Sequence, residues 1–127
     1  MRALLDTNFL MIPGEFKVDI FSQLISLGYL EFFTIDLVVE ELEKFSTKGG
    51  KVSRAARLAL ELIKNCDVTV IKTKNKESVD AELLKTAKER NLVICTQDKE
   101  LIKKIIQAGM RYITLRQGKY LVESGSI

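Results

Sequence analysis

The sequence predicts an α/β fold in which helices cover both faces of a parallel β-sheet. Short apolar or β-branched segments alternate with segments of helical spacing along the whole chain, as in strand–helix–strand units with right-handed crossovers. The length of 127 residues suits one domain. The 46% hydrophobic and 29% charged content is that of a globular protein with one core. We therefore expect a single three-layer α/β/α domain over residues 1–127.

The first half of the chain predicts two strands and three helices. Residues 2–5 are a short apolar run, typical of a buried strand, and residues 18–27 carry apolar side chains at helical spacing before a glycine. The aromatic and β-branched segment 32–35 predicts a second strand. A helix is expected over Asp36–Phe45, with the aspartate as its N-cap, and after a glycine-containing loop a strongly amphipathic helix over 52–65.

The second half continues the alternation of strands and helices. The expected strands are the apolar or β-branched segments 68–71, 92–96 and 112–115, and a short final one at 119–122. The expected helices, both with an apolar stripe, are residues 79–90, which Ser78 can cap, and residues 98–108, which end before a glycine. In open parallel sheets ligands bind beyond the carboxyl ends of the strands, so that edge is where a site is expected.

The composition excludes several classes of chemistry. Histidine is absent, which rules out histidine-based triads and histidine-ligated zinc. Cys66 and Cys95 lie far apart among apolar neighbours and are expected to be core thiols. The net charge of +3 allows a polyanionic partner without demanding one. No apolar run approaches the ~20 residues of a membrane span, and no signal peptide is visible, so we expect a cytoplasmic protein without a membrane partner.

Four acidic residues are expected at the carboxyl edge of the sheet. Asp6 ends the first strand, Glu41 lies in the helix after the second, Asp80 begins the helix after the third, and Asp98 follows the fourth. Each also has a structural interpretation: Asp80 and Asp98 favour helix N-termini, and Glu41 suits a solvated helix face. Asp6 is the hardest to interpret in that way, because the run before it is so apolar.

Carboxylates gathered around one cleft need a cation between them. Two unit charges ~4 Å apart repel by ~4 kcal/mol at an effective dielectric constant near 20. A set of donors made only of oxygen selects a hard ion, Mg²⁺ or Mn²⁺. Such an ion can activate water and neutralise a phosphodiester under attack.

Four short motifs, in this order, resemble the PIN-domain nucleases. They are L-L-D-T-N at 4–8, V-V-E-E-L at 38–42, Val79-Asp80 before a helix, and I-C-T-Q-D-K-E-L at 94–101. The sequence looks closest to small archaeal PIN proteins, including VapC-type toxins and the ribosome-biogenesis branch. This resemblance implies a parallel five-stranded sheet of order 3-2-1-4-5 and an endoribonuclease that cleaves single-stranded RNA with Mg²⁺ or Mn²⁺.

The resemblance also assigns roles to residues. The catalytic and metal-binding acids it implies are Asp6, Glu41, Asp80 and Asp98, with Glu82 as the alternative to Asp80. Asn8 and Thr96 match polar residues that accompany the first and the last acid and are expected to position them. The candidates for contacts with RNA phosphates, each of which also suits an ordinary solvated surface, are Lys44, Lys48, Lys51 and Arg54.

Several alternatives remain open at this level. A dehalogenase-type phosphatase needs a second aspartate at the position of Asn8, so that class is disfavoured. A non-catalytic PIN-like module that binds RNA or acts as a scaffold is the main alternative to an enzyme. A toxin implies an antitoxin partner, whereas a ribosomal-RNA-processing nuclease implies structured RNA and pre-ribosomal partners. Homodimerisation is a further expectation from the family.

Overall fold

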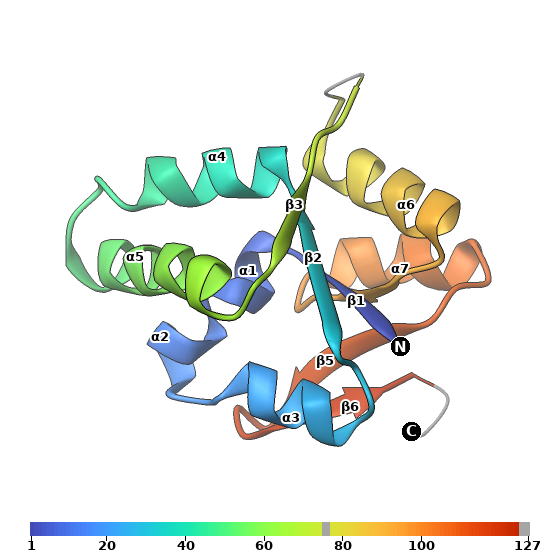
Figure 1. Ribbon diagram of the computed structural model, residues 1–127, viewed down its shortest axis with the longest axis horizontal. Coiled ribbons are helices and arrows are strands. Elements are labelled where there is room, and N and C mark those ends of the chain that lie inside the picture. The colour runs from blue at the N-terminus through green and yellow to red at the C-terminus, as the bar shows by residue number, and fades with distance from the viewer. Residues whose placement is uncertain (75–76, 125–127) are drawn as a thin grey trace.

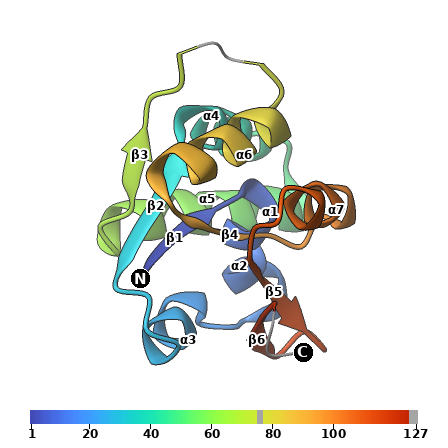
Figure 2. The ribbon, with the colours of Figure 1, turned by 90° about the vertical axis from the view of Figure 1, so that its right-hand side faces the viewer.

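The computed structural model describes residues 1–74 and 77–124, which form one six-stranded sheet flanked by helices. The strands in chain order are β1 (Arg2–Leu5), β2 (Glu31–Ile35), β3 (Thr69–Ile71), β4 (Val93–Cys95), β5 (Tyr112–Arg116) and β6 (Tyr120–Glu123). Their order across the sheet is β3-β2-β1-β4-β5-β6, and Figure 2 shows β3 and the β5–β6 hairpin at opposite edges. All pairs are parallel except β5–β6. The expected order 3-2-1-4-5 is confirmed, and β6 makes the sheet mixed instead of purely parallel.

Helices lie on both faces of the sheet, as the alternation predicts. They are α1 (Thr7–Leu10), α2 (Ile12–Phe16), α3 (Ile20–Ser26), α4 (Asp36–Phe45), α5 (Gly50–Asn65), α6 (Val79–Arg90) and α7 (Lys99–Gln107). Figure 1 shows α1, α2 and α5 on one side and α6 and α7 on the other. The change of side follows from the topology: right-handed connections that run from β1 towards β3 and those that run back from β3 to β4 and on to β5 cover opposite faces. None of the helices in the described part of the chain is long and apolar enough to cross a membrane.

Strand β1 lies at the centre of the sheet and supports the site. It pairs with β2 on one side and with β4 on the other. Ala3, Leu4 and Leu5 are fully buried, as expected for a parallel strand covered on both faces. The apolar run that precedes Asp6 is therefore a rigid support that ends at the carboxyl edge of the sheet.

Three local features differ from the sequence prediction. Residues 7–16, for which no helix is predicted, form α1 and α2, which are too short to show a helical period. The helix expected over 18–27 begins at Ile20, because the Asp19 carboxylate accepts the backbone N–H of Ser22 and caps it. Asp36 is not the N-cap of α4.

Asp36 is instead the first residue of α4, and Ile35 is in the N-cap position. The Asp36 carboxylate accepts hydrogen bonds from the backbone N–H and the hydroxyl of Thr73. It therefore ties the segment after β3 to the start of α4. The remaining expected elements agree with the observed ones to within a residue or two.

The corner between α4 and α5 is fixed by a buried serine. The Ser53 hydroxyl donates to the backbone carbonyl of Phe45 at 2.8 Å and accepts the backbone N–H of Gly49. Gly49 has a φ of 87°, a conformation that favours glycine. This contact sets where α4 ends and holds the backbone of its last residue.

Candidate active site

The four predicted acids lie around one cavity at the carboxyl edge of the sheet. The cavity measures about 180 Å³. Asp6 reaches it from the end of β1, Glu41 from the middle of α4, Asp80 from the first turn of α6 and Asp98 from the start of α7. The rest of its lining is Thr7, Asn8, Phe45, Val79 and Leu83. The sequence prediction thus named all four acids that line this cavity.

Asp6 is buried, with 4% of its surface exposed, and both of its oxygens are engaged. Oδ1 accepts the backbone N–H of Phe9 at 2.8 Å and so caps α1, while Oδ2 accepts the hydroxyl of Thr96. Burial raises the pKa of Asp6 to about 7, although these two hydrogen bonds oppose the shift. The charges of Asp98 and Asp80 raise the pKa of Asp6 further. With a pKa of about 7, the Asp6 carboxylate binds a proton as the pH falls through neutrality, unless a cation is bound there instead.

Thr96 connects the first and the last acid. Its side chain is fully buried, donates to Asp6 and accepts the backbone N–H of Asp98 at 3.0 Å. Asp98 in turn caps α7, because its Oδ1 accepts the N–H of Glu100 at 2.9 Å. One oxygen of Asp98 caps α7 while its side chain lines the cavity, so its position suits both the helix-cap interpretation and the site interpretation.

Asp80 and Glu41 complete the wall of the cavity from two helices. The pKa of Asp80 is raised, first by burial and then by the charges of Asp98 and Glu41. Lys104 on α7 opposes that shift, with its Nζ 4.0 Å from Asp80 Oδ2. The effects of Asp98 and Glu41 on the pKa of Asp80 show that these carboxylates are close enough to interact.

The donor set fits a hard divalent cation in its chemistry and location. All four acids supply oxygen, as Mg²⁺ and Mn²⁺ prefer. The Thr7 hydroxyl, in the lining of the same cavity, is buried and has no hydrogen-bond partner among the described residues. Within the described ranges no three acidic or cysteine side chains are gathered closely enough to hold one ion. Cation binding therefore requires rotation of side chains, for which Asp80, with 29% of its side chain exposed, has room.

Glu82, the alternative to Asp80, does not join this cavity. It is 3% exposed, and its carboxylate accepts the backbone N–H of Glu77 at 3.1 Å. It lines a different cavity of about 360 Å³, together with Lys72 and Lys85. Of the two candidates, Asp80 is the one that lies with the other acids.

The four basic candidates divide between two places. Lys44 and Lys48 line a cavity of about 270 Å³ that shares Glu41, Phe45 and Val79 with the acidic cavity. The two cavities are therefore adjoining.

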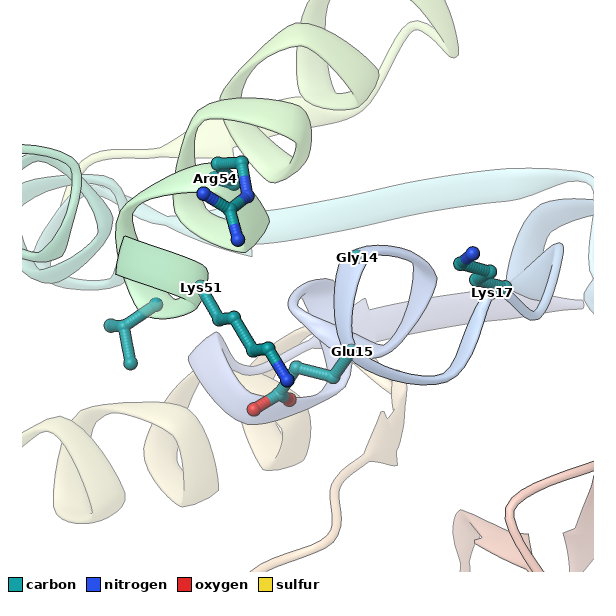
Figure 3. Close-up of a pocket in the computed structure, with 6 residues that line it drawn as sticks. Gly14, Glu15, Lys17, Lys51 and Arg54 are labelled. Atoms are coloured by element: carbon teal, nitrogen blue, oxygen red, sulfur yellow. The ribbon is translucent and has the colours of Figure 1, made fainter. Parts of the chain in front are cut away.

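Lys51 and Arg54 line a separate cavity of about 590 Å³ between α2 and α5. Figure 3 shows the Lys51 side chain extending towards Glu15 there. The helices come together at this cavity through Gly14, where a Cβ would lie 2.6 Å from Ala55 Cα. These two basic residues thus belong to a different surface from Lys44 and Lys48.

The sequence prediction assigns no role to Phe45, which lines the acidic cavity, or to Lys104, which contacts Asp80 from α7. Phe45 lies one helical turn after Glu41, so its place on the same face of α4 could have been deduced from the spacing. Lys104 meets Asp80 only because α6 and α7 pack side by side, and no local motif signals that contact. Asn8 is exposed and lies in the cavity lining, where the sequence prediction places it.

Comparisons with known proteins point to one family. Residues 3–118 match a family described as PIN like domain. Ribonuclease VapC9 of Archaeoglobus fulgidus is 33% identical over 118 residues, which cover 92% of this chain and 84% of that protein. Ribonuclease VapC4 of Methanocaldococcus jannaschii is 32% identical, over 96% of this chain and 95% of that protein. The structure of the PIN domain endonuclease Utp24 has a similar fold, with a TM-score of 0.78, 21% identity and coverage of 97% of this chain and 90% of that one.

Proposed function

The chain belongs to the family of PIN-like domains, and from this premise we propose that it is a Mg²⁺- or Mn²⁺-dependent endoribonuclease that hydrolyses phosphodiester bonds in single-stranded RNA. The observation that carries the proposal is the cavity lined by four carboxylates, one of them buried with a pKa raised to about 7. Such an arrangement is costly without a cation, which makes a structural purpose a poor explanation. Two relatives named ribonucleases support the assignment of the substrate class.

The proposed roles follow from how firmly each acid is held. Asp6 and Asp98 are fixed by hydrogen bonds and would provide the first two ligands. Asp80 and Glu41 would turn towards the ion from α6 and α4. When bound, the ion supplies charge neutralisation at the phosphate and activation of water. Thr96 keeps Asp6 and Asp98 in register, and Asn8 stands at the exposed rim, where it can orient the substrate.

The substrate strand would enter over the end of α4. Lys44 and Lys48 lie in the cavity next to the acids, so they can contact the phosphates that flank the bond to be cut. Lys51 and Arg54 lie in the separate cavity by α2, so we assign to them at most contacts further along the RNA.

The test is cleavage of RNA with Mn²⁺ by the unaltered protein and by Asp6→Asn. We expect cleavage by the former and none by the latter, while Glu82→Gln, a carboxylate-to-amide change outside the acidic cavity, cleaves normally. A second measurement needs no RNA: millimolar Mn²⁺ should raise the melting temperature of the unaltered protein and not that of Asp6→Asn. Equal cleavage by the unaltered protein and Asp6→Asn would refute the proposal, and so would cleavage that persists after chelation.

The relatives also favour one biological setting among those open from the sequence. Two VapC ribonucleases match nearly the whole chain, so we propose a VapC-type toxin whose antitoxin partner covers the acidic cavity. Mapping of cleavage sites on total RNA tests this setting. Cuts confined to precursor ribosomal RNA would favour the processing role instead, and light scattering would test the homodimer.

A further inference from the structure

The geometry points to Phe45 as the platform on which one base of the RNA stacks beside the bond to be cut, an inference that rests on the proposed function. Phe45 lines both the acidic cavity and the adjoining cavity that holds Lys44 and Lys48. Among the described residues that line either cavity, it is the aromatic one. Proteins that recognise single-stranded RNA place unstacked bases on such rings.

The ring is held in place before any RNA arrives. Phe45 is the last residue of α4, and the Ser53 hydroxyl holds its backbone carbonyl at 2.8 Å. The side chain is partly buried and packs against the hydrophobic core. A ring that is already fixed loses little conformational entropy when a base stacks on it, so more of the stacking energy remains for binding.

One face of the ring is occupied by a group that a base can displace. The Lys48 ammonium lies 5.4 Å from the centre of the Phe45 ring, and Lys48 is otherwise exposed. An exposed cation over a phenylalanine is a weak contact. A base that takes this face releases the ammonium, which can then contact a neighbouring phosphate.

The charges around Phe45 fit the same placement of the strand. Glu41, one turn before Phe45, lines both cavities, whereas Lys44 and Lys48 line only the adjoining one, which also has Glu40 and Glu77 in its wall. A strand with its reacting phosphate at the acids and its next phosphate at the lysines has the intervening base over the ring. Stacking accepts every base, so this contact sets affinity and position without a strict sequence preference.

The experiment combines a protein change with a loss of the base. An RNA oligonucleotide that the unaltered protein cleaves is prepared with a single abasic nucleotide at each position around the cut. Dissociation constants are measured with the non-cleaving Asp6→Asn chain, with and without Phe45→Leu. We expect one abasic position next to the cut to weaken binding about tenfold, a loss typical of one stacked base. Phe45→Leu should weaken binding of the intact RNA about as much. The abasic position should then cause no further loss of affinity in the Phe45→Leu chain.

Two controls keep packing separate from stacking. Phe45→Trp should retain the binding and the sensitivity to the abasic position. Phe16→Leu makes the same substitution at an exposed phenylalanine that packs near Gly118, and it should leave binding unchanged. The inference would be overturned if the abasic position and Phe45→Leu weakened binding independently, or if no abasic position weakened it. Cleavage by the unaltered protein, and its loss in Asp6→Asn, would still support the nuclease. Failure of the unaltered protein to bind or cleave RNA would overturn both.

Discussion

Substitution of Asp6 by asparagine should stabilise the metal-free protein at alkaline pH. The folded state raises the pKa of Asp6 from 3.8 to about 7, mainly through burial, so between these values the folded protein binds a proton that the unfolded chain does not. Stability therefore falls as pH rises from about 4 to about 7. Each pKa unit is worth about 1.4 kcal/mol, so the difference between the two pKa values lowers the free energy of unfolding by about 4 kcal/mol at pH 8.

The amide removes that cost and loses little else. The asparagine oxygen can still accept the N–H of Phe9, while the Thr96 hydroxyl loses its acceptor, which costs about 1 kcal/mol. Asp6→Asn should therefore be more stable than the unaltered protein by about 3 kcal/mol at pH 8. For a chain of 127 residues this is an increase of roughly 10 °C in melting temperature.

The assay is thermal and urea unfolding in a chelator at pH 4 and pH 8. At pH 4 the gain should vanish or reverse slightly, because the carboxyl is then protonated in the folded state. Asp19→Asn is the matched control: hydrogen bonds from Ser22 lower the pKa of that exposed cap, so its amide should destabilise at pH 8. An Asp6→Asn chain that is no more stable than the unaltered protein at pH 8 would refute the reasoning.

Three other substitutions test the geometry. Gly14→Ala should destabilise by about 1–3 kcal/mol in urea unfolding, because its Cβ would lie 2.6 Å from Ala55 Cα; unchanged stability would contradict the tight approach of α2 to α5. Ser53→Ala should cost about 1 kcal/mol in the same assay, since the Phe45 carbonyl and the Gly49 N–H lose their partner in a part-buried corner; unchanged stability would show that other contacts hold this corner. Asp80→Asn should reduce RNA cleavage by at least about tenfold while Glu82→Gln leaves it intact, and the reverse pattern would reassign the third acid.

The parts of the fold that follow from local patterns were predictable. The apolar run before Asp6 identified β1 as a buried strand, and Ser78 capped α6 as expected. Helices α1 and α2 were missed because neither is longer than about a turn, which leaves no period to detect. The role of Asp36 was missed because its partner, Thr73, is 37 residues away.

The acids were predictable as a set, but not in every detail. Asp6 and Asp98 each cap a helix and line the cavity, so the structural and functional interpretations were never exclusive. Asp80 and Glu82 are two positions apart on α6 and must face different ways. Which of them faces the other acids depends on how α6 is rotated about its axis, and that is set by packing of Leu83 and Ala87 in the core.

Strand β1 comes early in the chain yet lies at the centre of the sheet, which sets when the acidic cavity can form during synthesis. Asp6 finds its hydroxyl partner 90 residues later, at Thr96, and β1 lacks one neighbour until β4 has been made. A nascent chain that ends before α7 also lacks Asp98. Closing a loop of this length costs conformational entropy before the contacts between its ends can form, so the acidic cavity forms late. A ribosome carrying an unfinished chain is therefore not exposed to an assembled acidic cavity.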